Sequence, residues 1–147
     1  MMLFSKAQGR SVVDVRSAET FGRVVACSVA PSPPRISAVR LKARHGHKAY
    51  AVTWRNIQSF GRDAVTVRSA EDLLPEDEID SLAKEHESHE PFAKPVLSEN
   101  GEWLGTVKDV EFDEEDGRLC ALITEDGRLP GDCVLGVGSY AAVVRQP

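Results

Sequence analysis

The stretch Gly101–Thr124, GEWLGTVKDVEFDEEDGRLCALIT, begins with the pattern of a bulged β-strand. Val107, Val110 and Phe112 are the apolar positions of this strand. Strict alternation would place apolar residues two apart, so the step of three from Val107 to Val110 indicates a β-bulge at Lys108-Asp109.

The same stretch continues into an acidic turn and a second strand. Asp116-Gly117 predicts the turn, because glycine readily adopts the positive φ that a hairpin requires. Leu119–Ile123 follows as an apolar run of strand length, which is typical of a strand buried on both faces. The whole stretch therefore predicts a β-hairpin.

A related pattern occurs 83 residues earlier in the chain. This offset aligns Gly22 with Gly105, and the step of three recurs between Val24 and Cys27. Identical or apolar matches extend from residue 13 to residue 57: Val13/Val96, Val24/Val107, Cys27/Val110, Ile36/Leu119, Ala38/Ala121, Val39/Leu122, Val52/Leu135 and Ile57/Tyr140. One offset that preserves both register and bulge predicts a tandem duplication.

The length of 147 residues suits one compact domain or two very small ones. We predict a mainly β fold of two tandem small β-barrels joined by a short acidic helix or linker. The expected segments are a basic first repeat at 1–68, an acidic helical linker at 69–90 and an acidic second repeat at 91–147. Ile79, Leu82 and Ala83 would share one face of the linker helix. The sequence leaves open whether the repeats form separate barrels or a shared sheet system.

The net charge of −5 is divided unevenly along the chain. Residues 1–68 hold 12 Lys/Arg and 3 Asp/Glu, a net charge of +9, and residues 69–147 hold 6 Lys/Arg and 20 Asp/Glu, a net charge of −14. We therefore predict that the repeats pack with opposite charges facing each other. Exposed ion pairs contribute little stability, so apolar contact would hold the repeats together and charge would orient them.

These motifs in this order resemble the PRC-barrel family. The matching segments are Gly101-Glu102, Leu104–Val107 and Gly117–Leu119 in the second copy, with Phe21–Val24, Val52–Trp54 and Phe60–Val67 in the first. Two departures stand out: Pro31–Pro34 replaces the acidic glycine turn in the first copy, and Val137 stands where the offset expects the counterpart of Trp54.

The resemblance implies small β-barrels that act as assembly and adaptor modules and share no catalytic residues. Members of the family include the cytoplasmic part of the photosynthetic reaction-centre H subunit and the C-terminal domain of a ribosome maturation factor. We therefore expect a non-enzymatic protein that acts through protein–protein contacts, with an unknown protein or a second copy of itself as partner. The alternative is a ribosome- or RNA-associated factor that binds through the arginines of the first repeat: Arg16, Arg23, Arg35, Arg40, Arg44, Arg55, Arg62 and Arg68.

The sequence has no Gly-rich phosphate loop and no GxSxG or HExxH motif, so we predict no catalytic, cofactor or metal site. His45 and His47 lack a third ligand nearby, and a chelating pair at His86 and His89 stays open. The candidate partner surface consists of basic and aromatic residues: Arg23, Arg40, Arg44, Arg55, Trp54 and Trp103.

The three cysteines, Cys27, Cys120 and Cys133, match no zinc-binding spacing. We expect them to be reduced and structural. The chain also lacks an apolar run of about 20 residues and a signal-peptide pattern, so we expect a cytoplasmic location without membrane insertion.

Overall fold

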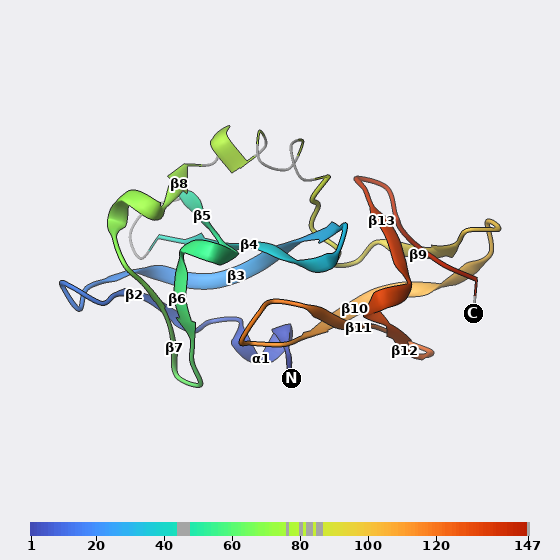
Figure 1. Ribbon diagram of the computed structural model, residues 1–147, viewed down its shortest axis with the longest axis horizontal. Coiled ribbons are helices and arrows are strands. Elements are labelled where there is room, and N and C mark those ends of the chain that lie inside the picture. Colours follow the sequence, from blue (N-terminus) through green and yellow to red (C-terminus); the bar gives the residue numbers. More distant parts are fainter. Residues whose placement is uncertain (44–47, 76, 80, 82–83, 85–86, 147) are drawn as a thin grey trace.

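The computed structural model describes residues 1–43, 48–75, 77–79, 81, 84 and 87–146, and it is mainly β (Figure 1). In these residues the strands form two seven-stranded sheets. The first sheet has the order β6-β7-β2-β3-β4-β5-β8. Its strands are β2 (Ser11–Asp14), β3 (Thr20–Pro31), β4 (Pro34–Lys42), β5 (Ala49–Thr53), β6 (Ile57–Phe60), β7 (Ala64–Val67) and β8 (Leu74–Pro75).

The second sheet has the order β12-β11-β10-β9-β14-β13, and β1 also pairs with β10. Its strands are β1 (Met2–Leu3), β9 (Pro95–Ser98), β10 (Trp103–Phe112), β11 (Leu119–Thr124), β12 (Gly127–Pro130), β13 (Val134–Val137) and β14 (Ala142–Val144). The helical elements include α1 (Phe4–Ala7) and the 3₁₀ turns η1 (Trp54–Asn56), η2 (Ala70–Asp72) and η3 (Gly131–Cys133).

The segment between the sheets is partly helical, as the linker prediction expects. Residues 77–79, 81 and 84 are helical, and Ile79 is buried. Leu82 and Ala83, which were expected to share its face, lie outside the described residues. The linker also contributes β8, which pairs with β5 at the edge of the first sheet.

The two sheets connect their main strands in the same way. β2 lies parallel to β7 in the first sheet, and β9 lies parallel to β14 in the second. The predicted bulge is confirmed: the register of β10 against β11 shifts between Val107 and Asp109, and that of β3 against β4 shifts between Val24 and Ala26. The two bulges lie at corresponding places in β3 and β10, 83 residues apart, as the sequence comparison predicted.

The predicted single offset is wrong beyond the return strand. Trp54–Asn56 and Gly131–Cys133 form the corresponding 3₁₀ turns, 77 residues apart, so Trp54 corresponds to Gly131 and not to Val137. The physical reason is the length of one hairpin: residues 43–48 connect β4 to β5, whereas residues 125 and 126 alone connect β11 to β12. Near the start of each sheet, Val12 pairs with Gly22 as Val96 does with Gly105, so Val12 rather than Val13 lies at the place that matches Val96.

The apolar core extends across both sheets. Phe112 from β10 lies edge-on to Trp54 and Phe60 of the first sheet, with ring centroids 6.1 and 5.1 Å away. Trp54 stacks on Phe60 and sits against the turn at Gly117, where an added Cβ would lie 2.8 Å from the indole. The predicted apolar contact between the two halves is therefore confirmed.

The predicted pairing of opposite charges between the halves is found at one place among the described residues. Of the three ion pairs found there, one joins the halves, between the Met1 ammonium and Glu114. Arg35 and Arg118 instead form a backbone bridge that places two arginines side by side. Among the described residues, the halves are thus joined mainly by apolar packing.

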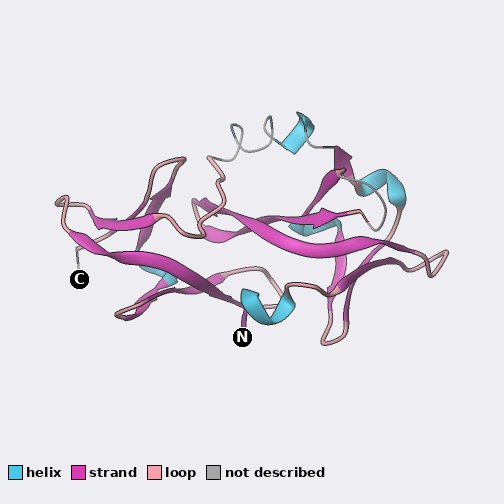
Figure 2. Ribbon diagram, turned by 180° about the vertical axis from the view of Figure 1, so that it is seen from behind, coloured by secondary structure: helices cyan, strands magenta, loops and turns pink. Residues whose placement is uncertain are grey.

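The N-terminal segment lies on the second sheet rather than the first. Met2 pairs with Phe112, and Phe4 of α1 is fully buried. The buried Asp109 carboxylate accepts hydrogen bonds from the backbone N–H and the hydroxyl of Ser5. Figure 2 shows α1 low in the molecule, with strands on both sides of it.

Candidate interaction surfaces

A row of apolar positions crosses the outer face of the second sheet. Trp103 of β10 pairs with Leu97 of β9, Leu97 pairs with Val143 of β14, and Val143 pairs with Gly136 of β13. Directly paired residues project to the same face of a sheet. The core faces the other side, where the neighbouring Val96, Ala142 and Val144 are buried. We call Trp103, Leu97, Val143 and Gly136 the outer row.

The outer row has a projecting end and a hollow end. Trp103 is 62% exposed. At the other end, a hollow of about 460 Å³ surrounds Gly136. Its walls come from three residues of the outer row (Leu97, Val143 and Gly136), from the β13–β14 turn with Tyr140, from Pro31 at the tip of the β3–β4 hairpin and from Glu87. Tyr140 is 74% exposed, and Leu135 of β13 is also exposed.

The corresponding row of the first sheet is mostly polar. Thr20 pairs with Val13, Val13 pairs with Thr66, and Thr66 pairs with Ser59. With the correct register, Gln58 corresponds to Leu135 and Asp63 to Tyr140. The same backbone framework therefore accepts a polar outer face, so the fold does not require the exposed apolar side chains of the second sheet. Exposed apolar patches of this kind mark contact sites.

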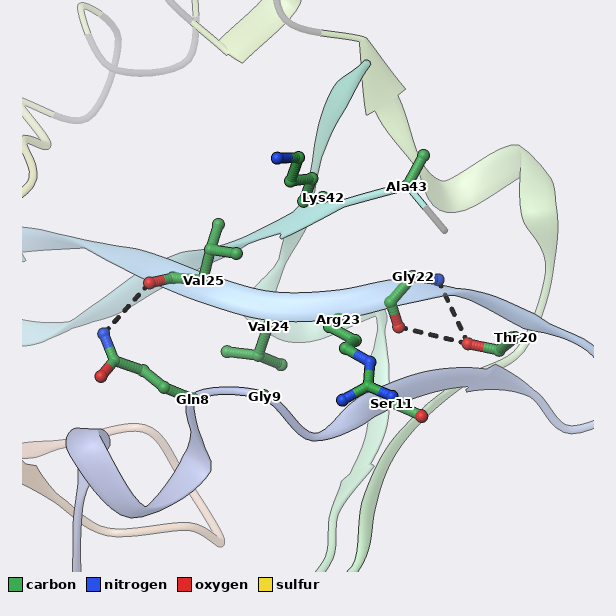
Figure 3. Close-up of a pocket in the computed structure, with 10 residues that line it drawn as sticks. All are labelled: Gln8, Gly9, Ser11, Thr20, Gly22, Arg23, Val24, Val25, Lys42 and Ala43. Atoms are coloured by element: carbon green, nitrogen blue, oxygen red, sulfur yellow. Dashed lines mark hydrogen bonds between the residues drawn. The ribbon is translucent and has the colours of Figure 1, made fainter. Parts of the chain in front are cut away.

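The first sheet instead carries a basic groove, shown in Figure 3. The groove has a volume of about 940 Å³ and runs between the Gln8–Ser11 segment and the ends of β3 and β4. Arg23 and Lys42 line it and are directly paired across the two strands. Like charges placed opposite each other repel, and neither side chain takes part in an ion pair with the described residues.

The structure separates the six candidate residues predicted from the sequence. Trp103 lies in the outer row and Arg23 in the basic groove, and Arg55 is exposed on η1. Arg40 is half-buried on β4, and its buried Nε has no hydrogen-bond partner among the described residues. Trp54 packs between the sheets and is not part of an outer surface, and Arg44 lies outside the described residues.

Sequence reasoning missed Leu97, Leu135, Tyr140 and Val143. The offset of 83 aligned Tyr140 with Ile57 and Leu135 with the core residue Val52. This alignment made Tyr140 and Leu135 look like core residues. An alignment that allowed a shorter hairpin would have matched them to Asp63 and Gln58. That contrast between apolar and polar residues is the signal that points to the outer row.

The described residues hold little that suggests chemistry. They contain no cluster of three or more potential metal ligands, and no described helix is long and apolar enough to span a membrane. His45, His47 and His86 lie outside the described residues, and the ring of His89 bonds the carbonyl of Val137 through Nδ1. The three cysteines are unpaired, and burial raises the pKa of the Cys27 thiol well above its ordinary value, which disfavours the nucleophilic thiolate.

The family comparison matches the part of the chain that holds most of the second sheet. The model of the PRC-barrel domain matches residues 83–145. These residues form a PRC-barrel domain. The match starts within the segment predicted as a linker and includes β9 to β14, so the complete outer row lies in the PRC-barrel domain. No curated protein matches the chain.

Proposed function

We propose that this protein is a non-enzymatic adaptor that binds another protein through the outer row of its PRC-barrel domain. The observation that carries the proposal is the contrast between the two sheets, which are apolar and polar at corresponding outer positions. Large aromatic side chains such as Trp103 and Tyr140 supply most of the binding energy at protein interfaces. An exposed tryptophan at one end of the row and an exposed tyrosine beside a hollow at the other are suited to that role.

We also propose that the first sheet is a second, divergent PRC-type unit, joined to the PRC-barrel domain by the acidic segment 69–90. Its support is the common strand order, the matching parallel pairs and the corresponding bulges. In this proposal the polar first unit stabilises the molecule through Trp54 and Phe60, and the second unit supplies the binding face.

Affinity capture tests the adaptor function. The full chain is the bait in a cell lysate of the organism from which it comes. The amounts of the captured proteins are then compared between the wild type and Trp103→Thr. We expect one or a few proteins to be captured by the wild type and reduced at least tenfold with Trp103→Thr. Val15→Thr is the matched control, because Val15 is an exposed apolar residue that follows β2 of the first sheet and does not line the basic groove. Capture that is equal for all three baits contradicts the proposal.

A second candidate function is RNA or ribosome association through the basic groove, favoured by the unpaired cross-strand cations Arg23 and Lys42. Binding of the full chain to RNA would then fall steeply with salt, because phosphate contacts release counterions. Charge reversal by Arg23→Glu with Lys42→Glu should abolish it. Absence of binding at low salt would eliminate this candidate.

A further inference from the structure

We propose that the outer row binds a second copy of this chain and forms a twofold-symmetric dimer. The inference rests on the proposed protein-binding function and names the partner. It follows from the order of the residues in the row, which is self-complementary in shape and in charge.

The shape argument starts from the two ends of the row. The row spans four strands, or roughly 14 Å at the usual strand spacing. Trp103 projects at one end, and the hollow at Gly136, which has no side chain, lies at the other. A twofold axis along the strands, between β9 and β14, would bring each Trp103 over the hollow of the other copy. Leu97 of each copy would then face Val143 of the other.

The hollow is suited to an indole ring. Tyr140 and Pro31 provide apolar surfaces against which the ring can pack. Glu87 also lines it and carries an acceptor for the indole N–H, which requires a hydrogen-bond partner when buried. The hollow thus offers both kinds of contact that a tryptophan needs.

The charges beside the row fit the same axis. Glu99 follows β9 and Arg145 follows β14, and the two strands stay in register there, since the Glu99 N–H bonds the carbonyl of Val144. Both residues are exposed. The axis that sets Leu97 against Val143 also sets Glu99 against Arg145 of the other copy. The dimer would therefore gain two ion pairs of opposite charge related by symmetry.

The expected dimer is weak. Stable interfaces bury about 800 Å² on each partner, and a single row on one small sheet covers less than that. We therefore expect dissociation in the micromolar range. Sedimentation velocity and light scattering on the full chain, from about 1 to 500 μM, measure this equilibrium.

Trp103→Thr, which introduces the residue found at the corresponding place of the first sheet, should weaken the dimer at least tenfold. Thr66→Ala on the first sheet should leave it unchanged, and circular dichroism verifies that each variant is folded. A wild type that stays monomeric at 500 μM overturns the proposal, as does an unchanged dimer in Trp103→Thr.

A mixing experiment tests the axis itself. Glu99→Arg and Arg145→Glu should each weaken self-association, because each sets like charges against each other. An equimolar mixture of the two variants should form a heterodimer of wild-type affinity, because both contacts become complementary. Failure of the mixture to associate contradicts the axis. If the wild type is monomeric while Trp103→Thr still abolishes partner capture, the adaptor function stands and the dimer alone is refuted.

Discussion

At Gly117, both the backbone conformation and the packing favour glycine over any residue with a side chain. Its φ is +80°, and an added Cβ would lie 2.8 Å from the indole of Trp54. The turn was predicted from its conformation, but the contact with Trp54 was not, because Trp54 is 63 positions away in the sequence. A glycine at this place lets the acidic hairpin of the second sheet approach the first.

We expect Gly117→Ala to destabilise the protein more than Gly101→Ala. Gly101 has nearly the same φ, +82°, with nothing within 4 Å of an added Cβ. It therefore reports the backbone strain alone, about 1–2 kcal/mol. Gly117→Ala adds the overpacking against Trp54, about 1–3 kcal/mol more. Urea unfolding of both variants measures the difference, and equal losses would show that Trp54 yields without cost.

At the scale of elements, the hairpin of β10 and β11 was predictable because its signals are local. The bulge, the glycine turn and the buried return strand follow from neighbouring residues. β6, β12 and the α1 segment were not predicted, because their sequences carry few apolar positions and their pairing partners are distant. The outer row as a whole was not predicted for another reason. Its residues come from four strands, and the shortened hairpin displaced the alignment of those in β13 and β14.

The short hairpin between β11 and β12 contains a carboxylate, that of Glu125, whose ionised form is stabilised by hydrogen bonds. The carboxylate of Glu125 accepts the backbone N–H of Thr106 at 3.0 Å, just beyond the last pairing of β10 with β11. Hydrogen bonds from its own backbone N–H and from that of Thr106 hold the pKa of this carboxyl below its ordinary value of 4.5. The folded state thus favours the ionised form.

We expect the stabilisation from Glu125 to be fully present above pH 4.5 and to disappear as the pH falls through the lowered pKa of the folded state. Glu125→Gln should therefore be less stable than the wild type at pH 6, and the difference should shrink at pH 3. Urea unfolding at the two pH values checks this. If the wild type and Glu125→Gln differ in stability by the same amount at pH 6 and pH 3, the charge of Glu125 has no role in stability.

At the scale of the whole molecule, the two sheets share one core and should unfold together. Phe112 contacts Phe4, Trp54 and Phe60, so its packing joins the N-terminal segment and both sheets. We expect Phe112→Ala to cost about 3–5 kcal/mol and to lower the stability of the first sheet as much as that of the second.

In a Trp103→Thr background, Trp54 fluorescence reports the contact between the sheets, and far-UV circular dichroism reports the strands of both. The two transitions should coincide, and Phe112→Ala should shift them together. Separate transitions would show that the sheets are independent folding units.

The pairing of β1 with β10 has a consequence for the growing polypeptide. Met2 and Leu3 leave the ribosome about a hundred residues before Phe112 and Glu111, their partners. At a translation rate of about 5–20 residues per second, this segment waits roughly 5–20 s for its strand. During that time the Phe4 ring has no Phe112 to cover it, so an early apolar surface is available to chaperones. Final closure of the core is thus a late event, timed by synthesis of the second sheet.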